Sequence, residues 1–255
     1  MKFGICVGVN QIKYLKEIDC DYAEVSLAGI ADMSDEEFEK LYEENAKSDV
    51  KIEAANGFFP AHIRVVWPDF NAKQIAEYTN LALGRASRLG IDTCILGSGR
   101  SRKYSEGYSH EKAIEDFSNA LRIVGDIAGR YNIVVGIEPL SYAETNVVNT
   151  VLDALEVSRR VGSDYIKVMA DFFHMMNNKE DLNSLKEVGK DLVHVHVSAY
   201  SIPGRPAPAS PTEDRYQEFF DILREIGFEG RISVEAVIRD LVKEGKTALE
   251  VLRSV

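Results

Sequence analysis

Four residues able to bind a cation recur at equivalent places in the second half of the chain, each at or near the end of a short apolar run. In chain order they are Glu138, Asp171, His196 and Glu235. Such runs, rich in valine and isoleucine, are typical of strands buried on both faces of a parallel sheet. The four residues are separated by about one strand-plus-helix unit, which takes ~30 residues. The pattern places one polar side chain at the end of each of four successive strands.

Carboxylate oxygens and imidazole nitrogens are ligands that Mn²⁺, Mg²⁺, Co²⁺ and Zn²⁺ accept in proteins. Three carboxylates in one place also need a cation, because like charges would otherwise push at least one of them to protonate. The alternative is that each is an unrelated strand-end residue facing solvent, but their matching positions favour a shared site. The sequence therefore predicts one divalent metal ion, with Mn²⁺ preferred, bound by the four residues Glu138, Asp171, His196 and Glu235.

Further polar residues lie where they could contact a substrate beside this metal. His174 and Glu144 follow two of the predicted ligands closely in the chain. His62 and Arg205 lie in two long, proline-containing connections, and long loops in a compact domain are often lids or binding loops. For each of these residues the alternative is an ordinary loop position that faces solvent or packs the loop.

Two other features leave their alternatives open. His194 and His196 point to the same side of one strand, and His196 is preferred as the ligand because it lies nearer the strand's end. His194 is interpreted at least as well as a buried core histidine. Residues 97–102 contain two glycines and two arginines, which could bind a phosphate or carboxylate, or could form a flexible basic loop.

The predicted ligands need a scaffold, and the chain shows eight strand-plus-helix units. The expected strands cover residues 2–9, 22–27, 50–57, 92–97, 132–138, 165–170, 192–198 and 231–237. Apolar residues between them recur at the 3.6-residue period of amphipathic helices. Strict alternation favours a parallel sheet, and eight units in 255 residues favour an α/β fold of the (β/α)8 barrel type. No linker indicates a second domain, so we predict one barrel domain over residues 1–255.

The composition narrows the classes of partner. A formal net charge of −11 disfavours nucleic acid, because binding phosphates needs a basic face. It also gives no reason to expect an anionic membrane surface. Three cysteines without motif spacing are typical of a reducing compartment. With no signal peptide recognisable and no apolar run long enough to cross a bilayer, we expect a cytoplasmic protein with a small-molecule substrate. Homo-oligomerisation stays open.

These motifs resemble the xylose-isomerase-like TIM barrels, the sugar isomerase/epimerase superfamily, over essentially the whole chain. The matching motifs are I-E-P at Glu138, D-x-x-H at Asp171 and His174, V-H-V at His196 and V-E at Glu235. The resemblance implies that the four strand-end residues hold one divalent ion, and that Glu138 and Glu235 form the acid/base pair. It further implies substrate contacts from His174, Glu144 and Arg205.

The function that this resemblance implies is a divalent-metal-dependent isomerase or epimerase of sugars or sugar phosphates. One glutamate would remove a proton beside a carbonyl and the other would return one, through a metal-stabilised enediolate. A dehydratase similar to the inosose dehydratases would use the same site. A hydrolase similar to the AP endonucleases is less favoured, because it needs a histidine-rich site for three zinc ions and a basic surface, whereas this acidic chain has 5 histidines.

Overall fold

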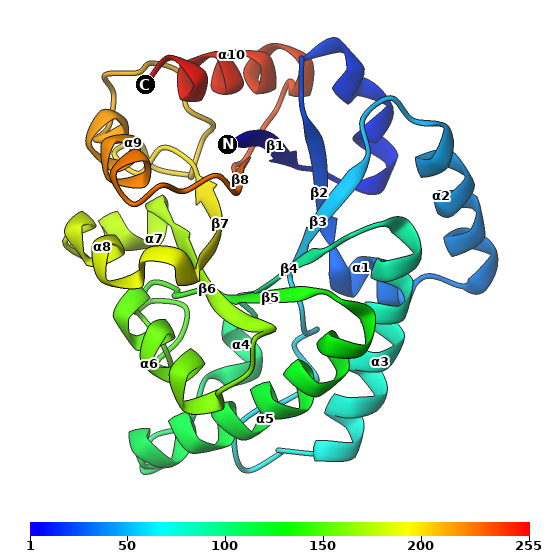
Figure 1. Ribbon diagram of the computed structural model, residues 1–255, viewed down its shortest axis with the longest axis vertical. Helices are drawn as coiled ribbons and strands as arrows, with labels where there is room; N and C mark the ends of the chain where they lie inside the picture. The colour runs from blue at the N-terminus through cyan, green and yellow to red at the C-terminus, as the bar shows by residue number, and fades with distance from the viewer.

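The computed structural model describes residues 1–255 and consists of a closed barrel of eight parallel strands with helices arranged around it (Figure 1). Neighbouring strands follow chain order, and β1 pairs with β8 to close the barrel. The strands are β1 (Lys2–Cys6), β2 (Tyr22–Ser26), β3 (Ile52–Asn56), β4 (Thr93–Leu96), β5 (Val134–Ile137), β6 (Ile166–Asp171), β7 (Leu192–Val197) and β8 (Arg231–Val234). The predicted α/β barrel is thus confirmed, and most strands are shorter at their ends than the apolar runs indicated.

Helices fill most of the connections between strands. The α-helices are α1 (Leu27–Asp32), α2 (Asp35–Lys47), α3 (Ala72–Leu89), α4 (Gly99–Arg102), α5 (His110–Tyr131), α6 (Val151–Val161), α7 (Phe172–Asn177), α8 (Leu185–Val188), α9 (Tyr216–Glu225) and α10 (Leu241–Ser254). Three short 3₁₀ helices are η1 (Val9–Glu17), η2 (Leu182–Ser184) and η3 (Gly189–Asp191). None of these helices is both long enough and apolar enough to cross a membrane.

The side chains inside the barrel form levels because residues alternate between the two faces of a strand. On β8, Arg231 lies at the amino end, Ser233 in the middle, and Glu235 directly after the carboxyl end. Arg231 reaches Glu53 at 2.8 Å and Asp92 at 2.6 Å, so ion pairs join the amino ends of strands across the barrel. The middle and upper levels hold the residues of the candidate site.

A glycine makes room for the aromatic side chain that underlies the middle level. A Cβ atom at Gly4 of β1 would lie 2.4 Å from the ring of Tyr22, so no larger residue fits there without a shift. Tyr22 is fully buried, and its hydroxyl lies 2.7 Å from the Oγ atom of Ser233. The absence of a side chain on β1 therefore lets a residue of β2 reach β8 inside the barrel.

The long connection after β7 is fastened at the carboxyl end of the barrel. The backbone N–H of Ala199 donates to the carbonyl oxygen of Pro206 at 3.0 Å, and that of Val237 donates to the carbonyl oxygen of Arg205 at 2.9 Å. Pro206 and Val237 also form an isolated parallel bridge. These contacts fix Arg205, in a left-handed backbone conformation with φ 52°, next to the end of β8.

Glu180, after α7, is a carboxylate with hydrogen-bond partners on only one of its two oxygens. Its Oε1 atom accepts hydrogen bonds from the backbone N–H of Val151 at 2.8 Å and from Ser184 at 3.2 Å. Its Oε2 atom is buried without a partner. Burial, with the nearby charge of Asp153, raises the pKa of Glu180 to about 7.

The substitution Glu180→Gln tests the cost of ionising the buried Glu180 carboxyl group. A carboxyl group whose folded pKa is raised destabilises the folded state increasingly as pH rises from about 4.5 through about 7. We expect the advantage of Glu180→Gln over the parent in unfolding free energy to grow by roughly 1–2 kcal/mol between pH 5 and pH 8. Urea unfolding at both pH values measures it. Glu187→Gln, at an exposed position, is the control, and the same pH dependence in both variants would contradict the assignment.

Candidate metal centre

The structure brings the four predicted ligands into one cluster at the carboxyl ends of β5 to β8. One ligand atom from each of Glu138, Asp171, His196 and Glu235 lies within 4.8 Å of all the others. The Nδ1 atom of His196 lies 3.4 Å from Glu138 Oε1 and 3.2 Å from Glu235 Oε2. Only Glu235 is partly exposed, with 28% of its side chain accessible, so the cluster opens toward solvent on that side.

The orientation of His196 fits the binding of a cation. Its Nε2 atom lies 2.8 Å from Glu24 Oε1, while its Nδ1 atom is buried and makes no well-formed hydrogen bond. Burial lowers the pKa of His196, but the charges of Glu24 and Glu235 outweigh this and hold that pKa well above its usual range, so a cation would have to displace a proton from Nδ1. A nitrogen aimed at carboxylates, with the opposite nitrogen held by a further carboxylate, is the arrangement found for histidines that bind metals.

Asp171 is oriented by the helix that follows it. Its Oδ1 atom accepts a hydrogen bond from the backbone N–H of Phe173 at 2.8 Å and thereby caps the first turn of α7. This N-capping contact leaves Oδ2 free to face the cluster. The sequence D-x-x-H therefore provides both a helix start and a candidate ligand atom.

A missing Cβ atom makes space for Glu138. A Cβ at Gly97, after β4, would lie 2.1 Å from Glu138 Oε2. The backbone N–H of Glu138 donates to Leu96 at 3.1 Å, and its carbonyl oxygen accepts from Arg102 at 2.6 Å. Strand pairing and this arginine fix the backbone, while Gly97 determines where the carboxylate fits.

Arg102 corrects one interpretation of the sequence. Residues 97–102 were candidates for an anion-binding or flexible basic loop, yet Arg102 is fully buried in the short helix α4. Its guanidinium lies over the ring of Phe117, and burial lowers its pKa to about 10. Arg102 is thus committed to supporting the end of β5 and is not exposed to an incoming phosphate.

Arg205 supplies a cation to the cluster itself. Its Nη2 atom donates to Asp171 and to Glu235, its Nε atom donates to Ser198 at 3.1 Å, and its guanidinium lies over the ring of Phe173. The sequence suggested that this arginine could hold a substrate hydroxyl or phosphate. In the structure it compensates two carboxylates that would otherwise repel one another.

The two glutamates of the cluster have different environments. Burial raises the pKa of Glu138 above its usual value, and the charge of Glu235 adds to this although His196 opposes it. Burial alone would raise the pKa of Glu235, but His196 and Arg205 bring it down to about 2. The side-chain amide of Asn56 also donates to Glu235 Oε1 at 3.1 Å.

The residues predicted to contact a substrate have different positions. His174 is buried beside the cluster, with Nε2 3.7 Å from Asp171 Oδ2, and its Nδ1 accepts the backbone N–H of Ser141 at 3.2 Å. Glu144 is half exposed and lies 3.7 Å from His174 Nδ1. His62, by contrast, is exposed, and no hydrogen bond or ion pair links it to the cluster. The structure therefore brings His174, Glu144 and Arg205 to the site but not His62.

Two residues at the site were absent from the sequence-based prediction. Glu24 lies in the middle of β2, and Asn56 ends β3. A charged residue in the centre of a buried strand was the available signal for Glu24, because alternation predicts that it points into the barrel. Asn56 occupies the same strand-end position as the predicted ligands, so the rule that found them also applied to it.

Comparisons with known proteins find a matching family and relatives of this chain. A family model described as a xylose isomerase-like TIM barrel matches residues 12–255. A 2-oxo-tetronate isomerase of Haemophilus influenzae is 33% identical over 160 residues, which are 61% of this chain and 59% of that protein. A 3-dehydro-D-guloside 4-epimerase of Escherichia coli is 29% identical over 123 residues, which are 48% of this chain and 45% of that protein. The chain thus matches about half the length of these curated relatives.

Solved structures share the fold over the entire chain. A D-psicose 3-epimerase from Clostridium cellulolyticum H10, solved with D-tagatose, superposes with a TM-score of 0.87. The match covers 100% of this chain and 99% of the other, at 19% sequence identity.

Gly97 gives a direct test of the geometry around Glu138. We expect Gly97→Ala to lower the unfolding free energy by about 1–3 kcal/mol, because the new methyl group overlaps a buried carboxylate. We also expect the affinity for Mn²⁺ to fall by about tenfold or more, since the carboxylate must move. Chemical denaturation and isothermal titration measure the two effects.

Gly99→Ala is the matched control for this test. The nearest atom to a Cβ at Gly99 is the end of the Leu140 side chain, at 3.0 Å, which can move aside. If Gly97→Ala behaves like Gly99→Ala in both measurements, the space beside Glu138 is not the constraint described here.

Proposed function

The chain belongs to the xylose isomerase-like TIM barrel family, and on that premise we propose that it is a divalent-metal-dependent isomerase or epimerase of sugars or sugar phosphates. The observation that carries the proposal is the set of three carboxylates converging on the free Nδ1 of His196. The activities in the names of the matched relatives, an isomerase and epimerases, support the reaction class.

The four ligands proposed for the cation are Glu138, Asp171, His196 and Glu235. A bound divalent cation, with Mn²⁺ our first choice, would supply a Lewis acid that polarises a carbonyl and acidifies the C–H bond next to it. The hard carboxylate oxygens suit Mn²⁺ and Mg²⁺, while the imidazole also admits Co²⁺ and Zn²⁺.

Glu138 and Glu235 are the proposed acid/base pair. They extend from β5 and β8, and their carboxylates approach His196 Nδ1 from two separate strands. One carboxylate removes the proton beside the substrate carbonyl, and the other returns a proton. Return to the opposite face of the same carbon gives an epimer, whereas return to the neighbouring carbon gives an aldose–ketose isomer.

Three neighbours are proposed to hold the substrate. His174 presents a buried imidazole beside Asp171, and Glu144 adds a half-exposed carboxylate next to it. Arg205 brings a guanidinium to the same opening, where it can donate to a hydroxyl or carbonyl oxygen. His62 is exposed and makes no hydrogen bond or ion pair with these residues, so it is proposed only as an outer contact of a larger substrate.

A dehydratase is the second candidate because the same acid/base pair can expel a β-hydroxyl group as water.

The AP endonuclease class has less support. The cluster offers a single histidine among four ligands, and the net charge of −11 opposes DNA binding. Chelator-sensitive cleavage of abasic duplex DNA would reverse this order.

The metal proposal is tested by titration. We expect about one Mn²⁺ per chain after exhaustive dialysis and reloading, and a loss of affinity of 100-fold or more in Asp171→Ala, because a directly coordinating oxygen is removed. Glu53→Gln, a strand carboxylate at the opposite end of the barrel, is the control. Parent-like Mn²⁺ binding by Asp171→Ala would exclude this ligand set.

The acid/base proposal is tested with metal-loaded Glu138→Gln and Glu235→Gln. Glutamine keeps the size of the side chain but cannot act as a carboxylate base, so we expect turnover to fall on the order of 10²–10⁴-fold in each variant. A screen of ketoses, aldoses, inososes and their phosphates with Mn²⁺ identifies the substrate. Metal content is measured in every sample.

Solvent exchange separates the two roles. In D₂O the parent should incorporate deuterium at the carbon beside the carbonyl. A variant that still exchanges this hydrogen without completing the reaction identifies the base for that direction. Near-normal turnover by a metal-loaded double variant would leave both glutamates as ligands only.

A further inference from the structure

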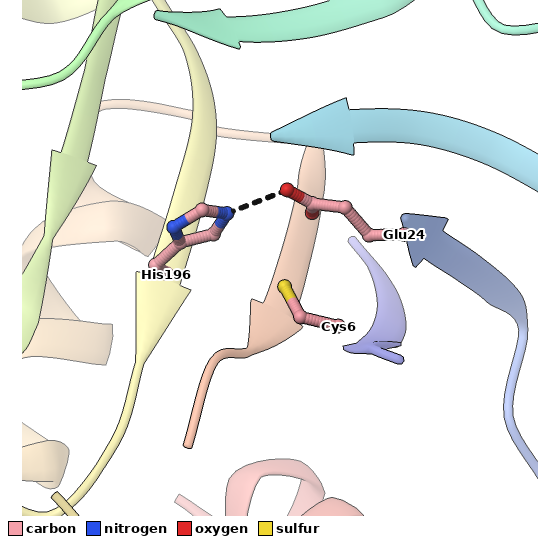
Figure 2. Close-up of side chains that lie close together, drawn as sticks. All are labelled: Cys6, Glu24 and His196. Atoms are coloured by element: carbon pink, nitrogen blue, oxygen red, sulfur yellow. Dashed lines mark hydrogen bonds and ion pairs between the residues drawn. The ribbon is translucent and has the colours of Figure 1, made fainter. Parts of the chain in front are cut away.

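Glu24 is a fully buried carboxylate that the proposed reaction does not use. It lies inside the barrel on β2, and both of its oxygens are bound by residues of other strands. Oε1 lies 2.8 Å from His196 Nε2, and Oε2 lies 2.8 Å from His194 Nε2. Figure 2 shows the carboxylate of Glu24 and the ring of His196 pointing toward one another from β2 and β7.

The two histidines act on Glu24 as donors. Three groups able to donate surround its two oxygens: Nε2 of His196, Nε2 of His194 and the hydroxyl of Ser233. An ionised carboxylate only accepts hydrogen bonds, so each Nε2 atom that contacts it must carry a proton. A neutral His196 in this position therefore has its proton on Nε2 and its lone pair on Nδ1.

We propose that Glu24 is the positioning residue for the ligand His196: it fixes the ring orientation and the tautomer that turn the Nδ1 lone pair toward Glu138, Asp171 and Glu235. Its negative charge behind the imidazole also strengthens that nitrogen as a ligand. His194 contributes to this positioning, because it binds Glu24 Oε2 and so restrains rotation of the carboxylate. This inference rests on the proposed function, since it concerns the same cation.

The middle level of the barrel is built to hold Glu24 in place. The Oγ atom of Ser233 donates to Glu24 Oε2 at 2.5 Å, and the hydroxyl of Tyr22 lies 2.7 Å from the same Oγ atom. Tyr22 in turn fits only because Gly4 has no side chain. Four strands thus contribute to the support of one carboxylate, namely β1, β2, β7 and β8.

An alternative interpretation is that Cys6, Glu24 and His196 form a second cation site, because one atom of each lies within 4.8 Å of the others. Figure 2 shows the Cys6 thiol beside this pair. The carboxylate of Glu24 is not free for such a site, because Oε1 contacts His196 while Oε2 contacts His194 and Ser233. A thiol is a poor ligand, and both oxygens of Glu24 are already engaged, so positioning explains the geometry better.

The experiment compares Glu24→Gln with the control Glu53→Gln, which also removes a paired strand carboxylate. We expect Glu24→Gln to raise the Kd for Mn²⁺ by about 10–100-fold, and Glu53→Gln to leave it within about twofold of the parent. In Zn²⁺-loaded protein with ¹⁵N-labelled histidine, the parent should show a protonated Nε2 on His196. That signal should be lost or mixed with the other tautomer in Glu24→Gln.

The alternative outcomes are distinguishable. A folded Glu24→Gln that binds Mn²⁺ like the parent and keeps Nε2 of His196 protonated would overturn the inference while leaving the metal site intact. If Glu24→Gln does not fold, Glu24→Asp decides, since its shorter carboxylate retreats from both rings. Its Kd should rise, and a parent-like Kd would overturn the inference. A parent that binds no Mn²⁺ would overturn the proposed function and this inference together.

Discussion

The crowding of buried carboxylates inside the barrel is the constraint on which the rest of the structure depends. Glu24, Glu138 and Asp171 are buried, Glu235 is partly exposed, and strand ends or strand centres hold all four within one small volume. An uncompensated buried carboxylate is strongly unfavourable, so each must meet a cation or several donors. The barrel meets this requirement in two ways, with the histidines of β7 in the middle level and with Arg205 at the opening.

The groups that compensate these carboxylates differ in how firmly the fold holds them. Glu24 is enclosed by donors that belong to strands, and these donors cannot leave without disturbing the barrel. Arg205 comes from a connection, although that connection is tied to the end of β8 through Val237. The lower carboxylate is therefore a fixed part of the framework, whereas Asp171 and Glu235 are balanced by a side chain from a connection between strands.

Much of the arrangement follows from rules that act along the sequence. The alternation of apolar runs and amphipathic segments predicts the barrel, and the polar residues at the ends of those runs predict the cluster. The same local rules fail where contacts between distant residues decide. Arg102 was predicted to belong to an anion-binding or a flexible basic loop, but its burial depends on Phe117 and on the carbonyl of Glu138. The contacts of Arg205 depend on a backbone bridge between two connections.

Glu24 is an intermediate case. Strand alternation is enough to point it into the barrel, but its partners lie on β7, some 170 residues further along the chain. Only the closure of the barrel brings β2 opposite β7, so no local pattern could pair them. Gly97 and Gly4 are similar, because the need for each glycine becomes visible only when the side chain from the neighbouring strand is in place.

The ion pairs of Arg231 with Glu53 and Asp92 lie at the amino ends of the strands, and they bear on which end of the barrel a small molecule can enter. Tyr22 and the buried histidines lie inside the barrel between these ion pairs and the cluster. For the proposed reaction, substrate and product would then use the same opening of the cluster, beside Glu235. One molecule has to depart before the next arrives, so the product should compete with the substrate for the free protein, and its departure can limit the rate.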